Sequence, residues 1–377
     1  MLAQICPHRL GSVDGLRGCL ALSVMVHHFY IWTNIKYFNG TWDAPDVNFI
    51  AQMGAGAVAL FFMTTGFVFY PRILNGWKST SWITVYITRV FRILPLTLLS
   101  VILITAVIYY RAGGTFNATY AYAAAHWLSG FGEPDLLGYT DSGRINAYVL
   151  WSLWYEWVFY IAVLPLSAIA MDIVKNRRLP SWTLPVALLC LAFASRIFSK
   201  VFNHDLEFLR MLPLFGVGML AYEIQARENL KNLLCSRMCS VIAVGCLVIA
   251  MTATRNPYGI SLPLFGIFFI CVAAGNNVWG LLDTRPAGVL GEISFSIYLL
   301  HGIVIDVLFV DANSWMSKLG FAEANLTLCA VSLIVVAVSS LSFLLVEKRA
   351  IAIGKAVARS WDGRKLRLSA HELDVAP

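Results

Sequence analysis

Long apolar runs recur from residue 16 to residue 346, and no long hydrophilic block interrupts them. Apolar residues make up 59% of the 377 residues and charged residues only 13%, which is about half the charged share of an average soluble domain. A helix needs roughly 20 apolar residues to cross the hydrocarbon core of a bilayer. The pattern therefore predicts an all-α, polytopic membrane protein with one membrane domain and no soluble catalytic module.

Ten candidate spans follow from these runs, at about 15–32, 50–70, 91–110, 148–171, 182–199, 208–223, 240–253, 259–275, 288–310 and 325–346. The seventh run is short, and only the segment from Thr254 to Tyr258 separates it from the eighth. A re-entrant pair of shorter helices is therefore the alternative to two full spans at this place.

Basic residues indicate the orientation of the chain. With the amino terminus placed inside, 20 of the 28 Lys and Arg residues fall on inner segments and eight on outer ones. Because cytoplasmic loops retain basic residues, we predict that both termini are cytoplasmic, as an even number of spans requires. The formal net charge of +7 then needs no nucleic-acid partner. We expect a membrane-embedded domain, residues 1–346, and a basic cytoplasmic tail, residues 347–377, that lies against anionic headgroups.

The eight cysteines show neither metal-ligand spacing nor a disulfide framework. Cys235 and Cys239 are four positions apart, but no second pair of ligands accompanies them, so we expect no bound metal. The first apolar run lacks a small-residue cleavage site, and we therefore expect no cleavable signal.

That first run, Val13–Phe29, carries Arg17 and the adjacent pair His27 and His28. An Arg within a membrane costs roughly 2.5–3.5 kcal/mol on insertion scales, so such residues point to function. Arg17 and His28 are eleven positions apart, which brings them within about 20° of one helix face and about 16 Å apart along the axis. Imidazole is suited to accept a proton near neutral pH, whereas His27 faces elsewhere and is expected to be a bystander. The alternative is that Arg17 anchors the helix and His28 only packs.

Other ionisable residues lie in or beside later spans. Arg89 and Arg92 share a helix face where the third span leaves the cytoplasm, and a guanidinium pair can bind phosphate bidentately. Ordinary flanking charge is the alternative. Glu156 lies in the fourth span among three tryptophans and two tyrosines, where a carboxylate is costly unless it is paired or protonated.

In the ninth span, Ser294, Tyr298 and His301 share one face by their spacing. His301 and Asp306 also form an H-x4-D pattern, but about 140° of helix rotation separates them, so we discount it as a catalytic pair. With a rise of about 1.5 Å per residue, His28, Glu156 and His301 are each expected at roughly 18 Å from the inner face. The arginines gather beneath them at the cytoplasmic mouth, which favours a functional site over scattered packing residues.

These residues resemble the motifs of the integral-membrane acyltransferase-3 family, and the resemblance covers nearly the whole chain. The matching segments, in order, are Asp14–Gly18 with His28 and Phe29, Arg89 and Arg92 with Pro95, Trp151–Leu153 with Glu156, Gly291–His301, and Val346–Lys348. The chain departs from the family pattern at Thr64 and Thr65, where Leu-Ser is usual before Gly-Phe, and at Phe295, where Tyr is frequent. We expect these departures to affect which substrate is bound rather than the chemistry of acyl transfer.

The resemblance implies transfer of an acyl group, usually acetyl from acetyl-coenzyme A, to a sugar hydroxyl of a surface polysaccharide, lipopolysaccharide or related glycan. It implies no permanently bound cofactor, a cell-membrane location such as a bacterial inner membrane, and a stand-alone form without a fused esterase-like domain. The implied roles are donor phosphate binding by Arg89 and Arg92, general base or acyl relay by His28, donor or charge stabilisation by Arg17, orientation or proton relay by Glu156 and His301, and support by Asp14, Ser294 and Tyr298.

Two other classes of protein remain open at this stage. A proton-coupled transporter or flippase of a glycan or lipid precursor would use the buried Glu and His residues as proton relays, but the inverted repeats typical of transporters are not apparent. A structural membrane subunit would tolerate apolar residues at these positions.

Overall fold

The computed structural model describes residues 11–202, 207–310 and 319–374, and all regular structure within them is helical. Glycines and capping side chains mark several helix ends. Gly76 and Gly113 have φ angles of 88° and 71°, which glycine adopts readily, and each ends a helix. The Asn117 side chain accepts a hydrogen bond from the backbone N–H of Tyr120 and so caps the next helix. The first eight helices are α1 (Gly11–Phe38), α2 (Asn48–Asn75), α3 (Trp82–Ala112), α4 (Ala118–Ser129), α5 (Trp151–Val158), α6 (Leu164–Asn176), α7 (Thr183–Phe202) and α8 (Leu212–Gln225).

Two π-helical segments join neighbouring helices into longer ones. Phe159–Val163 connects α5 to α6, and Phe343–Glu347 connects α15 to α16. Such segments occur often at functional sites because they shift side chains out of the regular register. The remaining helices are α9 (Glu228–Leu234), α10 (Arg237–Ala253), α11 (Leu262–Ala273), α12 (Arg285–Glu292), α13 (Ser294–Val310), α14 (Phe321–Leu326), α15 (Leu328–Ser342) and α16 (Lys348–Asp374).

Five helical stretches of the described chain are long and apolar enough to cross a membrane, namely α2, α3, α5 with α6, α7, and α15 with the first part of α16. The number rises to seven if each bent pair, α9 with α10 and α12 with α13, counts as one span. α1 has 28 residues but is not among them, because Asp14, Arg17 and two histidines lower its hydropathy. The chain is a helical membrane protein, whereas ten spans and cytoplasmic termini stay predictions.

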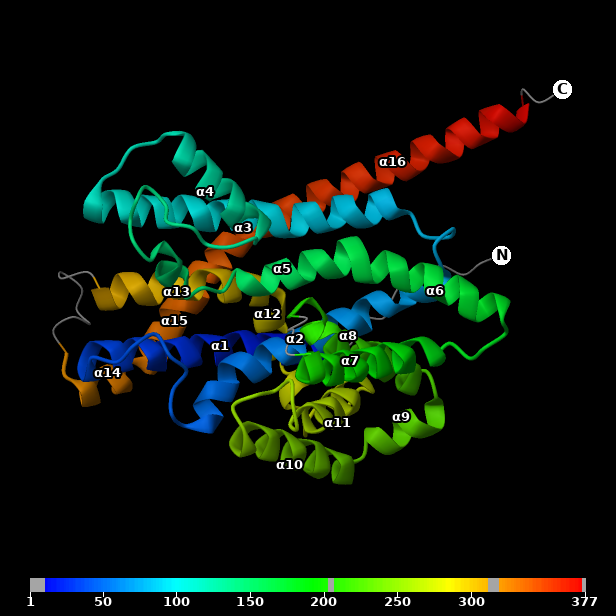
Figure 1. Ribbon diagram of the computed structural model, residues 1–377, viewed down its shortest axis with the longest axis horizontal. Helices are drawn as coiled ribbons and strands as arrows, with labels where there is room; N and C mark the ends of the chain where they lie inside the picture. The colour runs from blue at the N-terminus through cyan, green and yellow to red at the C-terminus, as the bar shows by residue number, and fades with distance from the viewer. Residues whose placement is uncertain (1–10, 203–206, 311–318, 375–377) are drawn as a thin grey trace.

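Several long helices run side by side along the longest axis of the molecule (Figure 1). α1 packs against α2, α12 and α13, and α2 packs against α8. α4 lies beside the carboxyl-terminal part of α3 at one end of the bundle, and α16 packs along α3 and extends beyond the other end. The core at their centre contains large, fully buried side chains such as Trp32, Phe62 and Phe159.

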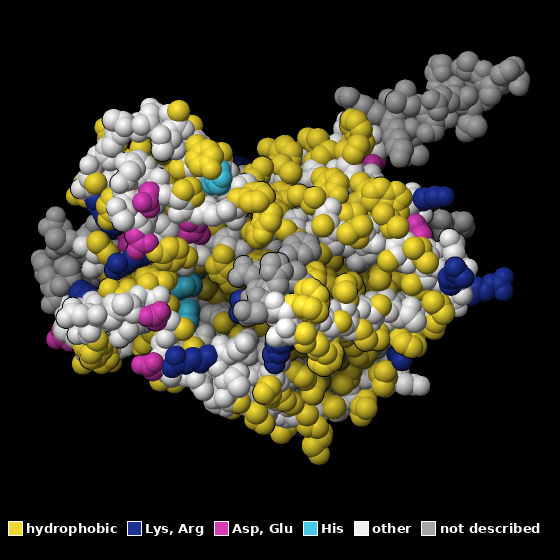
Figure 2. All heavy atoms as spheres, in the orientation of Figure 1, with side chains coloured by type: hydrophobic (Ala, Val, Ile, Leu, Met, Phe, Trp, Pro, Cys, Tyr) yellow, Lys and Arg dark blue, Asp and Glu magenta, His cyan; other side chains and the backbone are white. Residues whose placement is uncertain are grey.

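Apolar side chains also cover much of the outer surface (Figure 2). Exposed examples come from the outward faces of α3, α6 and α7, including Ile102, Leu166 and Phe193. A water-soluble domain seldom exposes so large an apolar surface, whereas the hydrocarbon of a bilayer covers it at no cost.

Close backbone contact brings the start of α1 against α12. A Cβ atom at Gly291 would lie 2.1 Å from the carbonyl oxygen of Asp14, and one at Gly18 would lie 2.7 Å from the backbone nitrogen of Gly291. Only glycine allows the two backbones to approach this closely. α12 and α13 then meet at an angle of 73°, which places Ser294, the first residue of α13, next to the start of α1.

The segment before α5 enters the bundle before it becomes helical. Ser142 and Asn146 lie in a 3-10 helical turn and are fully buried, and a Cβ atom at Gly302 of α13 would lie 2.4 Å from the backbone of Asn146. α5 therefore starts at Trp151, already inside the bundle, so that Glu156 lies deeper than in a span that begins at the membrane surface.

Candidate active site

A cavity of about 690 Å³ opens between α1, α2, α3, α5, α13 and α16. This volume lies in the usual range for small-molecule sites. Six basic residues line it, against three acidic ones. The basic residues are Arg17, Arg72, Arg89, Arg92, Lys348 and Lys355, and the acidic ones are Asp14, Glu156 and Glu292. This positive surplus in a partly enclosed space favours an anionic ligand.

Arg89 extends along the aromatic wall of the cavity. Its guanidinium lies 5.0 Å from the ring centre of Phe69 and 5.8 Å from that of Tyr160, and the guanidinium of Arg72 lies 5.1 Å from the same Phe69 ring. The Nε atom of Arg89 is buried and has no hydrogen-bond partner within the described part of the chain. Two guanidinium groups that share one ring repel each other, and an anion between them would relieve this repulsion.

Arg92 is held by a carboxylate. Its Nη1 atom lies 3.4 Å from an oxygen of Glu347, and the second oxygen of Glu347 accepts a hydrogen bond of 2.8 Å from Ser296. Glu347 is only 1% exposed and lies in the π-helical segment before α16. The predicted arginine pair is therefore not symmetric, because Arg92 has a buried partner while Arg89 lies against aromatic rings.

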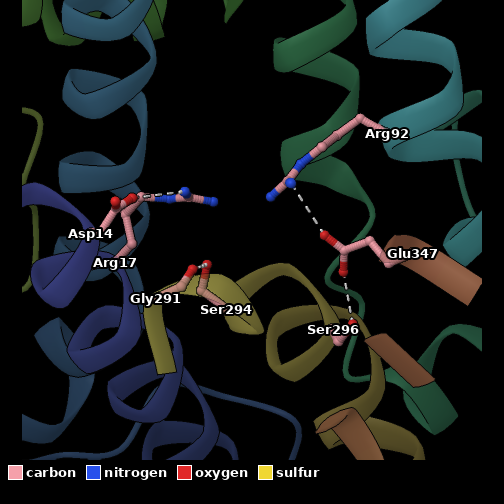
Figure 3. A network of polar contacts seen from close by, with 7 residues as sticks. All are labelled: Asp14, Arg17, Arg92, Gly291, Ser294, Ser296 and Glu347. Carbon is pink, nitrogen blue, oxygen red and sulfur yellow. Dashed lines mark hydrogen bonds and ion pairs between the residues drawn. The ribbon is translucent and has the colours of Figure 1, made fainter. Parts of the chain in front are cut away.

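Arg17 reaches the cavity from the opposite side (Figure 3). Its guanidinium lies 3.7 Å from the carboxylate of Asp14, one turn earlier on α1. Arg17 and Arg92 extend toward the same space, and Ser294 lies below them (Figure 3). Ser294, the first residue of α13, donates a hydrogen bond of 2.9 Å to the carbonyl of Gly291 in the last turn of α12. The N-terminal dipole of α13 adds partial positive charge here.

Glu156 lies in this cavity with the arginines. Its carboxylate interacts electrostatically with Arg89, Arg17 and Arg92, and it accepts a hydrogen bond of 3.4 Å from the hydroxyl of Tyr160. Three guanidinium groups thus offset the free-energy cost of burying this carboxylate among aromatic side chains.

His28 and His301 lie outside the cavity and contact each other. The Nδ1 atom of His28 is 2.9 Å from Nε2 of His301, and the two rings stack with centres 5.0 Å apart. Of the three ionisable groups predicted to share one level, the structure brings these two together. It places the third, Glu156, with the arginines.

The hydrogen bonds assign the proton positions of the neutral pair. The Nδ1 atom of His301 lies 2.9 Å from the carbonyl of Ile297, which can only accept, so this nitrogen carries the proton. Nε2 of His301 is then the acceptor, and Nδ1–H of His28 donates to it. The lone pair of His28 Nε2 is left to accept a proton, as a general base requires.

Tyr298 separates the cavity from the histidine pair. It lines the cavity, and its ring centre lies 6.3 Å from that of His301. Its hydroxyl is 2.8 Å from the hydroxyl of Ser152 on α5 and donates to the carbonyl of Val149 at 3.2 Å. Side chains from α5 and α13 thus form the layer through which any group would pass from the arginines to the imidazoles.

Two further titratable residues, one on α1 and one on α13, have partners of their own. His27 contacts the carbonyl of Ile50 through Nδ1 at 2.9 Å and packs where a Cβ atom at Gly54 would clash, so it joins α1 to α2. Asp306 pairs with Arg111 at 2.6 Å rather than with His301. Within the described residues, no group of three His, Cys, Asp or Glu side chains could hold a metal ion.

The sequence analysis placed Glu347 and Ser152 in matching motifs without giving either a role, and it missed Trp42. Glu347 is a carboxylate at the end of an apolar run, and the cost of burying it should have indicated a basic partner. Ser152 lies within a matching motif, whereas Trp42 left no signal in the sequence. The ring of Trp42, from the loop after α1, stacks 6.2 Å from that of His28.

A model of an acyltransferase domain family matches residues 10–347. The chain belongs to the acyltransferase-3 family. The match includes the arginines, carboxylates and histidines described above, from Asp14 to Glu347, and ends before Lys348 and Lys355. This acyltransferase matches none of the curated proteins and none of the solved structures.

The three departures of this acyltransferase from the usual motifs all line the cavity. Thr64 and Thr65 come from α2 and Phe295 from the first turn of α13. Each threonine hydroxyl donates to a carbonyl one turn earlier on its own helix, at 2.9 and 3.2 Å. The departures therefore concern the lining of the cavity and not its arginines.

Proposed function

We propose that this acyltransferase moves an acyl group, acetyl in the simplest case, from cytosolic acyl-coenzyme A to a sugar hydroxyl of a surface glycan or glycolipid. The observation that carries the proposal is the arginine-lined cavity beside an oriented imidazole pair, in a chain of the acyltransferase-3 family. The cavity supplies charge for an anionic donor, and the pair supplies a base.

The donor occupies the cavity. Arg89 and Arg72 bind its phosphates, and Arg17 with the amino terminus of α13 binds or stabilises charge nearer the thioester. Arg92, held by Glu347, shapes the wall and adds charge. Glu156 orients the arginines, and Asp14 and Ser294 support Arg17 and the start of α13.

His28 acts on the acceptor. Its Nε2 atom takes the proton of the sugar hydroxyl while that oxygen bonds to the thioester carbonyl carbon. The carbon–sulfur bond then breaks, and the departing coenzyme A thiolate takes the proton from the imidazolium. His301 keeps His28 in the required tautomer. Because Tyr298 lies between the cavity and the histidines, either its side chain moves aside or the acyl group is relayed past it.

The proposal includes the topology. With ten spans and both termini in the cytoplasm, the starts of α1 and α3 face the cytosol, where coenzyme A is found. Residues 1–346 form the membrane domain and residues 347–377 the basic tail, of which Glu347, Lys348 and Lys355 pack into the domain. The protein then resides in the cell membrane, as in a bacterial inner membrane, and the bilayer is its permanent partner.

Mass spectrometry of surface glycans from cells with and without the gene tests this function. We expect glycan O-acyl esters that disappear with the gene and return with the wild-type gene but not with the Arg17→Gln variant. An unchanged ester content in the deleted strain would overturn the proposal.

A further inference from the structure

A second, smaller cavity lies at the opposite end of α1 from Arg17. Its volume is about 150 Å³, close to that of a cavity that accepts a single six-membered ring. The ends of α3 and α13 and the segment before α5 contribute to it. Its lining residues include Trp32, Arg111, Tyr139, Asp141, Arg144 and Asp306.

Two buried polar groups in this wall lack partners. The indole nitrogen of Trp32, a residue that is 2% exposed, has no hydrogen-bond partner in the described chain, and neither has Nε of Arg144. A buried donor without a partner costs about 1–3 kcal/mol, so a ligand that accepts hydrogen bonds here would be favoured.

Trp32 and Tyr139 give the cavity wall its aromatic side chains, and Trp42, which does not line the cavity, packs against Trp32. The guanidinium of Arg144 lies 4.7 Å from the ring centre of Trp32 and 5.9 Å from that of Trp42. The two indoles meet edge to face, with ring centres 5.4 Å apart. Arg111 and Asp306 form an ion pair at 2.6 Å in the same wall. Aromatic faces combined with fixed donors and a carboxylate are suited to a ring that carries hydroxyl groups.

This cavity lies on the histidine side of Tyr298. Trp32 follows His28 by four positions, one turn further along the same face of α1. Trp42 contacts both residues, since its ring stacks on His28 and meets Trp32. The molecule is hollowed on this side, and histidine side chains are visible in the hollow (Figure 2).

We infer that this cavity binds one sugar ring of the acceptor, with Arg144 and the indole N–H of Trp32 donating to its hydroxyl oxygens. The inference rests on the proposed function and assigns its acceptor site. The donor and acceptor then approach the histidine pair from opposite ends of α1, and neither has to pass the other.

Saturation-transfer NMR on the protein in nanodiscs tests this site. The probes are the methyl glycosides of glucose, galactose, mannose, rhamnose and N-acetylglucosamine. We expect at least one to bind the wild type, and its affinity to fall roughly tenfold in Arg144→Gln and in Trp32→Phe, which removes only the N–H donor and keeps an aromatic ring. Arg210→Gln is the matched control, because the guanidinium of Arg210 lies 5.0 Å from the ring centre of Tyr258, away from both cavities.

Coenzyme A binding, measured by equilibrium dialysis on the same samples, separates the two proposals. We expect Arg144→Gln and Trp32→Phe to bind coenzyme A as the wild type does. If the wild type binds coenzyme A but no glycoside, or if both variants bind the glycoside normally, the acceptor site is wrong while the proposed function stands. If both variants also lose coenzyme A, the effect is a general loss of structure and a separate sugar site is excluded. If the wild type binds a glycoside through Arg144 but no coenzyme A, the sugar site stands and the proposed donor is wrong.

Discussion

The Nδ1 atom of His28 lies 2.9 Å from Nε2 of His301 and joins α1 to α13 across 273 positions of sequence. His301 is fully buried and is itself held by the carbonyl of Ile297. This chain of hydrogen bonds resembles a catalytic base held by an orienting group, with an imidazole in place of the usual carboxylate.

We predict that His301 acts through the position and tautomer of His28. His301→Ala should lower the rate of acyl transfer by about 10–100-fold, the usual effect of losing an orienting partner. His301→Gln should retain more activity, because its amide oxygen can still accept from His28 Nδ1–H. Initial rates at matched protein abundance provide the measurement. Equal losses in both variants would show that His301 does not act as a hydrogen-bond acceptor.

Arg89 and Arg92 should differ in what their loss affects. Arg89→Gln should raise the KM for acetyl-coenzyme A by roughly tenfold, because a charge-assisted hydrogen bond to phosphate is lost. Arg92→Gln should instead lower the stability by up to about 3 kcal/mol, because it leaves the buried carboxylate of Glu347 without its basic partner. Steady-state kinetics and thermal unfolding of the purified variants measure the two effects.

A second substitution controls for the Arg92 effect. The double variant Arg92→Gln with Glu347→Gln removes both charges and should recover much of the lost thermal stability, since the Ser296 hydroxyl can donate to the amide oxygen. A double variant as unstable as Arg92→Gln alone would contradict a role for this ion pair.

Glu133 should make the stability depend on pH. Burial raises the pKa of Glu133 to about 8, against the smaller opposite effect of a hydrogen bond from the backbone N–H of Leu150. The folded chain keeps this proton between about pH 4.5 and 8 while the unfolded chain loses it, so the contribution of Glu133 to stability falls over that range. The Gln side chain of Glu133→Gln does not titrate. The unfolding midpoint of this variant, minus that of the wild type, should therefore rise by about 2 °C or more as the pH is raised from 5 to 8.5.

The Glu133→Gln variant controls for the loss of the hydrogen bond from the backbone N–H of Leu150. The Gln side-chain oxygen can still accept from Leu150 N–H, so only the charge changes. A constant difference between the two proteins across this pH range would exclude a raised pKa at Glu133.

The sequence was sufficient to predict the helical membrane class and five of the nine charged residues around the cavity. Arg17, Arg89 and Arg92 could be found because an ionisable group at a membrane mouth is costly and stands out against apolar neighbours. The sequence placed His28 and His301 at a similar depth in the membrane, but it could not predict their contact. Side-chain pairing depends on how α1 and α13 rotate against each other.

The level of Glu156 was misplaced for a physical reason. A straight span that begins at the surface puts it beside the histidines, but the buried turn at Ser142–Asn146 precedes α5 and moves its start inward. The layer at Tyr298 also depends on the 73° bend before α13, and no residue pattern indicates the size of such a bend. The small cavity at Arg144 is closed by the irregular segment before α5, for which helical periodicity gives no rule.

The central claim is that the imidazole of His28 is the base of an acyl transfer. The most direct test is to follow radiolabel from acetyl-coenzyme A into glycan in membrane vesicles that hold equal amounts of wild type, His28→Ala or His126→Ala. His126 is half-buried on α4, lines neither cavity and is the matched histidine control. We predict that His28→Ala lowers the rate by about 10²–10⁴-fold while His126→Ala keeps the wild-type rate. Undiminished transfer by His28→Ala would contradict the account.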